Sequence, residues 1–248
     1  MNVYIAELIG TALLVLLGNG AVANVVLPRT KGNDSGWIVI TAGWGLAVFV
    51  AVACTERFSG AHINPAVTLG LATAGRFEWA LVPGYLAAQL AGAMVGAGLV
   101  WSAYRSHYQA ADNPGAILAT FATGAEIRSA PTNFVCEVIG TFVLVFTLLL
   151  FADGTLLGAE GQTVGTIGLG SLGAAPAGLL VFAIGLSLGG PTGYAINPAR
   201  DLGPRIVHAL LPIRGKRDSD WGYSWIPILG PVAGAGLAAV VWGAVVLP

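Results

Sequence analysis

The sequence contains the tripeptide Asn-Pro-Ala twice, once in each half, and both copies lie in apolar stretches. An Asn directly before a Pro signals the start of a helix, because Asn caps free backbone N–H groups and Pro needs no donor in the first turn. A helix that starts inside a membrane directs its positive dipole end and its amide donors toward a cavity. Two such starts therefore predict a pore. The residues concerned are Asn64, Pro65, Ala66, Asn197, Pro198 and Ala199.

The residues just before each tripeptide should be non-helical and should present backbone carbonyls to that pore as acceptors. Irregular backbone is tolerated at this depth only where it lines water or is buried in protein. A lane with acceptors along it and two Asn donors at its middle suits water or a neutral polyol. The two helix starts also place positive potential at the centre, which opposes protons and cations. The carbonyl-bearing residues are Gly60, Ala61, His62, Gly193, Tyr194 and Ala195.

Arg200 lies one turn into the second short helix. A charged side chain deep in a bilayer costs at least about 2.5–3.5 kcal/mol. We therefore expect Arg200 to face the pore, where its planar donors can bind hydroxyl groups and its charge repels cations. The alternative is an ion pair with Asp201, but adjacent residues on a helix do not face each other.

Two carboxylates, Glu7 and Glu137, lie in apolar stretches at matching positions of the two halves, in Glu-Leu-Ile-Gly-Thr and Glu-Val-Ile-Gly-Thr. They could relay protons, or they could accept bonds from backbone N–H groups of the loops before the short helices. Their symmetric placement favours the structural role. His62 has no metal-ligand partners at useful spacing and is interpreted as a pore-wall or loop-bracing residue. The sequence predicts neither a metal nor a cofactor.

Six apolar stretches are long enough to cross the hydrocarbon core, which needs about 20 residues of helix. They run approximately over residues 3–27, 37–55, 79–103, 133–152, 171–189 and 225–247. The stretches 64–74 and 197–210 are too short to span and are predicted as re-entrant half-helices. The polar connections 28–36, 104–132, 153–170 and 212–223 are predicted as loops.

The composition places the chain in a lipid bilayer. The sequence is 56% hydrophobic and only 9% charged, whereas soluble domains carry roughly 25% charged residues. The formal net charge of −1 argues against a nucleic-acid partner, which would require a basic patch. Cys54 and Cys136 lie in apolar segments and are interpreted as buried small hydrophobic residues.

The two halves repeat one plan. Residues 1–103 and 133–248 each contain three spans and one half-helix, and the loop 104–132 links them. Because three is an odd number, the second unit must enter the membrane in the opposite orientation. Inverted repeats of this kind place a binding or conduction site at the midplane, where broken helices meet. The sequence thus predicts an all-α membrane protein that forms a single channel domain of six transmembrane helices and two half-helices.

On these motifs the sequence resembles the major intrinsic protein (aquaporin) family over nearly its whole length. Asp201, directly after Arg200, resembles the glycerol-facilitator branch and is expected to have a structural role. The resemblance implies a selectivity filter in which Gly185 leaves room for a three-carbon polyol and Trp44 offers an apolar wall. It also implies a homotetramer with one pore per subunit. The filter residues would be Trp44, Gly185, Tyr194 and Arg200.

The function that this resemblance implies is a passive channel for glycerol, other small neutral solutes and water that excludes ions and protons. Its location would be a cell membrane, of the prokaryotic inner-membrane kind. Tyr194 replaces the Phe of the best-known glycerol facilitator, and its hydroxyl leaves open a water-selective or a lactic-acid-permeable channel. A proton-coupled secondary transporter and an adhesive membrane protein are further alternatives. No nucleophile–base pair or phosphate-binding Gly loop is found in the sequence, so an enzyme is not predicted.

The charges of the loops oppose the orientation that the resemblance implies. The family places both termini and the second and fourth connections in the cytoplasm, where this chain has only Arg57 and Arg76. The positive-inside rule would predict the reverse topology. We follow the family, because the paired tripeptides fix the fold. The opposite loops hold Arg29, Lys31, Arg105, Arg128, Arg214, Lys216 and Arg217.

Overall fold

Six helices in the computed structural model are long and apolar enough to cross a membrane, within the described residues 1–152, 154–160 and 162–246. This confirms the six predicted spans, and most bounds differ from the predicted ones by a few residues. The predicted last residue of the sixth span, Leu247, lies outside the described residues, as does Asp153. The helices are α1 (Val3–Val26), α2 (Trp37–Ser59), Trp79–Ala103 with α4 (Val82–Ala103), α7 (Ala130–Leu150), Gly170–Leu188 with α8 (Ala175–Leu188), and α10 (Ile226–Val246).

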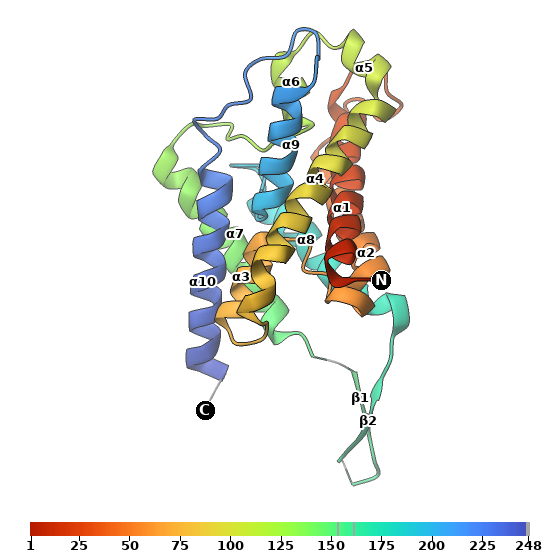
Figure 1. Ribbon diagram of the computed structural model, residues 1–248, viewed down its shortest axis with the longest axis vertical. Coiled ribbons are helices and arrows are strands. Elements are labelled where there is room, and N and C mark those ends of the chain that lie inside the picture. Colours follow the sequence, from red (N-terminus) through yellow and green to blue (C-terminus); the bar gives the residue numbers. More distant parts are fainter. Residues whose placement is uncertain (153, 161, 247–248) are drawn as a thin grey trace.

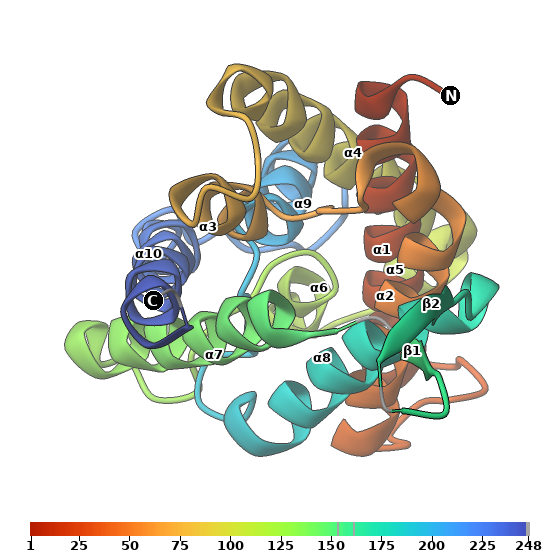
Figure 2. The same ribbon diagram turned by 90° about the horizontal axis from the view of Figure 1, so that it is seen from below.

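Two short helices, α3 (Pro65–Thr73) and α9 (Pro198–Leu210), lie between the long ones (Figures 1 and 2). Helix α3 packs against α10, α4 and α7, and α9 packs against α4 and α10. They contain 9 and 13 residues, which at about 1.5 Å per residue is too short to cross the hydrocarbon core. The predicted half-helices and the aquaporin-like fold class are thereby confirmed.

Glycines allow the long helices to approach each other closely in pairs. A Cβ atom at Gly92 of α4 would lie 2.2 Å from the carbonyl oxygen of Leu8 in α1. A Cβ atom at Gly234 of α10 would lie 2.4 Å from the carbonyl oxygen of Val138 in α7. Small residues at such crossings are how membrane helices gain packing energy without a hydrophobic driving force. Glu7 lies on α1 of the first pair, and Glu137 lies at the matching position on α7 of the second pair.

Two of the predicted loops contain regular structure. The connection 104–132 includes the short helices α5 (Arg105–Ala110) and α6 (Pro114–Ala119). The connection 153–170 forms an antiparallel hairpin of β1 (Gly154–Leu157) and β2 (Thr163–Ile167), which projects from the helical body in Figure 1. Alternating Thr with Leu, Val and Ile gives these segments strand propensity, which the glycine content of the loop obscured.

The burial predicted for the two cysteines is wrong for Cys54. Its side chain is exposed on α2, whereas Cys136 is half-buried. The outward faces of these helices carry many exposed apolar residues, for example Leu46 on α2 and Leu179 on α8. Hydrocarbon is as favourable for an apolar side chain as the protein interior is. An apolar segment of a membrane helix therefore does not predict which of its residues face inward.

Candidate functional site

Each half-helix begins at an Asn that caps it. Asn64 has extended backbone angles, and its Oδ1 accepts from the backbone N–H of Ala66 at 2.9 Å. Asn197 does the same, and its Oδ1 accepts from Ala199 N at 3.0 Å and Arg200 N at 3.2 Å. Pro65 and Pro198 each occupy the first helical position. The caps follow from the local sequence alone.

The two caps also bind each other's loops. The amide Nδ2 of Asn64 donates to the carbonyl of Ile196 at 2.8 Å, and that of Asn197 donates to the carbonyl of Ile63 at 2.9 Å. One N–H of each amide is used in this way. The second has no hydrogen-bond partner within the described part of the chain. Both Asn residues line the main cavity, so two amide donors are available there.

The loop before the first tripeptide is held by Glu7. Its Oε1 accepts from His62 N at 3.0 Å and from the Ser59 hydroxyl at 2.7 Å. Its Oε2 accepts from Ile63 N and from the Gln89 amide, both at 2.7 Å. Four donors therefore surround one buried carboxylate, as expected for a polar network that fixes the shape of a loop.

The loop before the second tripeptide is held by Glu137 in the same manner. Its Oε1 accepts from Ala195 N at 3.0 Å and from the Thr192 hydroxyl at 2.7 Å, and its Oε2 accepts from Ile196 N at 2.9 Å. The described structure does not place Glu7 or Glu137 in the lining of the cavity.

Backbone angles explain why such anchoring is needed. Ala61 and Ile63 have φ values of 48° and 45°, and Tyr194 and Ile196 have values of 38° and 42°. Positive φ is uncommon outside glycine and is a marked outlier for a β-branched residue such as Ile. The two glutamates hold this strained backbone in place by accepting hydrogen bonds from its N–H groups.

A cavity of about 520 Å³ runs between these loops and the long helices. One wall is polar, because both loops line it with Gly60, Ala61, His62, Tyr194 and Ala195. Gly193 is not in this lining, and a side chain at its position would contact Thr123. The facing wall is apolar and is formed by Leu14, Val48, Val52, Leu144, Leu148 and Val181.

His62 lines the cavity, and its ring is held by a hydrogen bond to helix α3 and by aromatic neighbours. Its Nδ1 lies 3.1 Å from the Thr68 hydroxyl, and its ring packs against Phe77 and Tyr85. Within the described residues, no group of three or more His, Cys, Asp and Glu side chains could hold a metal ion.

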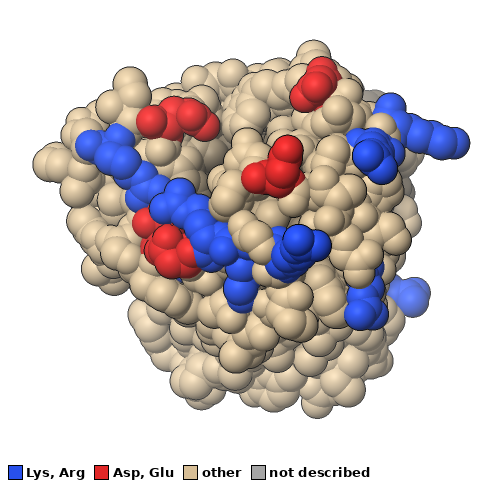
Figure 3. Space-filling model, turned by 90° about the horizontal axis from the view of Figure 1, so that it is seen from above, with Lys and Arg blue, Asp and Glu red and all other residues tan. Residues whose placement is uncertain are grey.

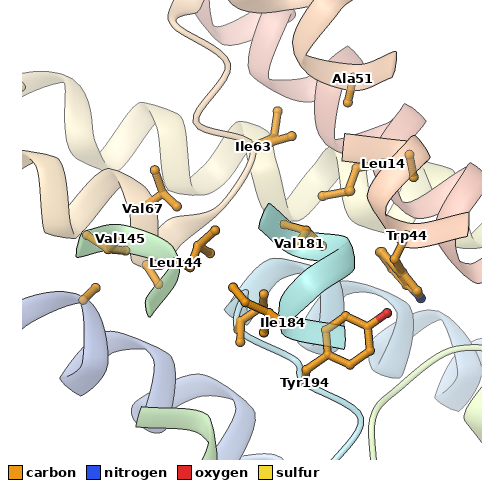
Figure 4. Packing of buried hydrophobic residues seen from close by; sticks show 14 of the residues in the cluster. Leu14, Trp44, Ala51, Ile63, Val67, Leu144, Val145, Val181, Ile184 and Tyr194 are labelled. Atoms are coloured by element: carbon orange, nitrogen blue, oxygen red, sulfur yellow. The ribbon is translucent and has the colours of Figure 1, made fainter. Parts of the chain in front are cut away.

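Three of the four predicted filter residues line one end of the cavity. The Arg200 Cζ lies 4.0 Å from the centre of the Trp44 ring, and Tyr194 lies nearby. Figure 4 shows Trp44 and Tyr194 on neighbouring elements, beside Val181 and Ile184 of α8. Among the described residues, the Arg200 guanidinium, the Trp44 Nε1 and the Tyr194 hydroxyl have no hydrogen-bond partner.

Gly185 borders the filter through Tyr194. A Cβ atom at Gly185 would lie 2.8 Å from Tyr194 Cζ and 3.0 Å from its hydroxyl. The recess that we expected to be open for a polyol therefore holds the tyrosine ring. Trp37 packs against the Tyr194 ring as well. Its Nε1 donates to the Gly185 carbonyl at 3.1 Å, and its ring contacts the Tyr194 ring edge-on with the ring centres 5.9 Å apart.

Asp201 faces away from Arg200 and binds Arg205. Its Oδ1 lies 2.8 Å from Arg205 Nε, and both side chains are fully buried. Its Oδ2 accepts from the Thr123 N–H at 2.8 Å and the Thr123 hydroxyl at 2.7 Å. Arg205 also donates to the carbonyls of Thr123 and Ser219. The pair therefore ties two loops to α9.

Sequence reasoning did not find several of these supporting residues. Arg205 could have been found, since it follows Asp201 by four positions, the spacing of helical neighbours. Nothing in the local sequence indicated Gln89 or Thr123, because each acts through a partner far away in the chain.

Comparison with known proteins agrees with the fold. The family model described as "Major intrinsic protein" matches residues 1–242, and the chain belongs to this family. It is 54% identical over 242 residues to a probable glycerol uptake facilitator protein of Thermotoga maritima, and 98% of each chain is covered. The same values hold for the glycerol uptake facilitator protein of Streptococcus pneumoniae. The solved structure of the aquaglyceroporin from Plasmodium falciparum matches with a TM-score of 0.83 and 31% identity, covering 99% of this chain and 96% of that one.

Proposed function

We propose that the protein is a passive channel through which glycerol and other small neutral solutes diffuse across the cell membrane together with water. The observation that carries the proposal is the two-sided cavity, in which a lane of carbonyl and amide groups faces an apolar wall. A polyol has hydroxyl groups along one edge and carbon–hydrogen bonds along the other. The names of the relatives and of the structural neighbour support the same solute class.

In this proposal the filter selects the solute by shape and by hydrogen bonding. The unpartnered Arg200 guanidinium donates to solute hydroxyls. The rings of Trp44 and Tyr194 contact the carbon backbone. Farther in, loop carbonyls accept hydrogen bonds from the solute, and the free N–H groups of Asn64 and Asn197 donate to it.

Ions are excluded by the same features. Each half-helix start carries about half a positive charge, and Arg200 adds a full charge at the filter, so cations and protons meet a barrier. An anion would have to leave its hydration shell in a lane whose facing wall is apolar. Glu7 and Glu137 are surrounded by donors and lie outside the lining, which supports a structural role over proton relay.

We also propose that residues 1–103 and 133–248 are inverted repeats within a single channel domain. The matching roles of Glu7 and Glu137 and the reciprocal bonds of the two caps support this.

A homotetramer with one pore per subunit is proposed from the family resemblance alone. Light scattering coupled to size-exclusion chromatography would test it.

Stopped-flow light scattering of proteoliposomes tests the channel. Under an inward glycerol gradient, vesicles should shrink and then re-swell quickly, and under a sucrose gradient they should only shrink. Gly185→Ala should slow glycerol re-swelling more than water flow, because the new Cβ pushes on Tyr194. The matched control is Gly236→Ala on α10, where a Cβ meets nothing within 4 Å.

Two outcomes would contradict the proposal. Wild-type vesicles that pass water quickly but re-swell no faster than protein-free vesicles in glycerol would indicate the water-selective alternative. Saturable glycerol uptake that collapses with the proton gradient would indicate a coupled transporter.

A further inference from the structure

A second cavity, of about 380 Å³, lies where the end of α4 meets α5 and the loop after α9. The buried Tyr108 and Ile213 and the half-buried Trp101 form its floor. The exposed Arg105 and Arg214 stand at its rim. This cavity shares no lining residue with the channel cavity, so the proposed conduction does not use it.

The two rim arginines have no ionic or hydrogen-bonding partner among the described residues. Neither Arg105 nor Arg214 has a carboxylate oxygen within 4.0 Å or a side-chain hydrogen bond within the described ranges. The Arg105 guanidinium is oriented by Trp101, whose ring centre lies 5.2 Å from its Cζ. Two guanidinium groups that share one cavity repel each other unless an anion lies between them.

Three other basic residues on the same face are engaged within the protein. Figure 3 shows Lys and Arg side chains gathered on this face, with acidic groups beside some of them. Arg128 pairs with Asp220, and Arg217 pairs with Asp218 at 3.4 Å. Lys216 donates to three carbonyls at the end of α9, at 2.5–2.9 Å. The free arginines at the cavity are therefore not explained by internal pairing.

The surroundings place the cavity at the level of lipid headgroups. Helix α4 exposes Val95 and Leu99, at 48% and 47%, within two turns before Trp101, and these residues face hydrocarbon. Tryptophan is enriched where membrane and water meet. The helix ends at Ala103, and Arg105 follows two positions later. We therefore expect the two guanidinium groups to lie at the level of the phosphates of adjacent lipids.

We infer that this cavity binds the phosphate of an anionic phospholipid headgroup. Arg105 and Arg214 can each offer paired N–H donors to phosphate oxygens. The aromatic and aliphatic floor contacts the glycerol backbone of the lipid. A lipid whose headgroup also carries a cation, such as phosphatidylcholine, is disfavoured because that cation is repelled by the two guanidinium groups. The inference does not depend on which solute the channel conducts.

Native mass spectrometry of the purified full chain tests it, with dioleoylphosphatidylglycerol as the probe and dioleoylphosphatidylcholine as the comparison. The wild type should bind the anionic lipid more tightly. Arg105→Gln/Arg214→Gln should weaken that binding by about 30-fold, because each cation near the membrane surface contributes about 1 kcal/mol. Thermal unfolding without added lipid should match the wild type closely, since neither side chain makes a hydrogen bond or an ion pair within the described residues.

The matched control is Arg29→Gln/Lys31→Gln, which removes two charges from the loop between α1 and α2 on the same side of the protein. It should keep wild-type affinity for the anionic lipid. Equal loss in both double variants would overturn the inference, because binding would then reflect net charge alone. Unchanged binding in Arg105→Gln/Arg214→Gln would also overturn it. Displacement of the lipid by inorganic phosphate at low concentration would overturn the lipid assignment and indicate a site for free phosphate.

The charge-conserving pair Arg105→Lys/Arg214→Lys provides a second readout. It keeps both charges but loses the paired geometry of the donors. An intermediate affinity for dioleoylphosphatidylglycerol is expected. Affinity as low as that of the glutamine pair, together with a lowered unfolding temperature in both pairs, would show that the arginines support the fold, and it would overturn the inference.

Discussion

The ring of Tyr194 occupies the space that a side chain at Gly185 would need, with Tyr194 Cζ only 2.8 Å from the position of such a Cβ atom. The same ring also reaches Gly189, the residue that follows α8, where a Cβ would lie 2.5 Å from Tyr194 Cδ1. Two glycines one turn apart thus form a groove for the ring. The groove sets how far Tyr194 extends toward Trp44 and Arg200.

Gly189→Ala should therefore change selectivity although Gly189 does not line the cavity. The added methyl group would also meet Trp37 Cζ2 at 2.8 Å, so the Tyr194 ring must shift. Overpacking of this kind costs about 1–3 kcal/mol. We expect glycerol permeability to fall at least about fivefold, with a smaller effect on water, in stopped-flow measurements. Gly190→Ala is the control, since a Cβ there meets nothing within 4 Å; equal effects of the two variants would contradict the prediction.

Tyr194→Phe should retain glycerol flow and change the passage of other solutes. The Tyr194 hydroxyl is buried and has no partner among the described residues, so it is available to a passing solute. Loss of one hydrogen bond, worth about 1 kcal/mol, should reduce the permeability of protonated lactic acid about fivefold. The measurement compares glycerol, water and lactic acid in the same vesicles. Identical values for all three in wild type and variant would exclude a role for the hydroxyl.

Glu7→Gln should destabilise the first loop. The substitution keeps the size of the side chain but replaces one acceptor oxygen by a donor, which then faces the N–H of Ile63 or the Gln89 amide. Hydrogen bonds to a charged group contribute about 1.5–3 kcal/mol each, so a loss of at least about 2 kcal/mol is expected in thermal unfolding. Glu78→Gln, at an exposed position between α3 and α4, should have no effect. An unfolding temperature equal to that of the wild type would show that Glu7 does not hold the loop.

Asp201→Asn should loosen the outer loops. The substitution leaves the buried Arg205 without its negatively charged partner, and breaking a buried ion pair in this way costs about 3–5 kcal/mol. Thermal unfolding should show the loss, and the double variant Asp201→Asn/Arg205→Met should recover part of it. No recovery in the double variant would indicate that the hydrogen bonds of Asp201 to Thr123, rather than the ion pair, carry the stability.

The parts of the fold that depend on local sequence could be predicted. Asn64 and Asn197 cap their helices through bonds to residues two or three positions away, and the length of the apolar stretches determines the spans. The matching positions of Glu7 and Glu137 indicated their anchoring role, although the hydroxyl and amide groups that complete each network gave no signal in the sequence.

The remaining features depend on contacts between distant segments. The sequence gives the residue types at 185 and 194, but only the packing of α8 shows that the tyrosine ring fills the recess beside Gly185. The hairpin after α7 was missed because the glycine content of the loop obscured the strand propensity of its Thr, Leu, Val and Ile residues. The exposure of Cys54 could not be predicted, since apolar residues are equally favourable on either side of a helix in lipid.

The reciprocal bonds from Asn64 to Ile196 and from Asn197 to Ile63 have a consequence for biosynthesis. During translation the first half-helix emerges more than 130 residues before the carbonyl that its Asn64 amide binds. Until then, that amide and the carbonyl of Ile63 have to be satisfied by water or by temporary partners in the insertion machinery. The first re-entrant loop therefore reaches its final conformation only after the second half has been synthesised and inserted. The pore between the two loops is therefore completed in a single late step of biosynthesis.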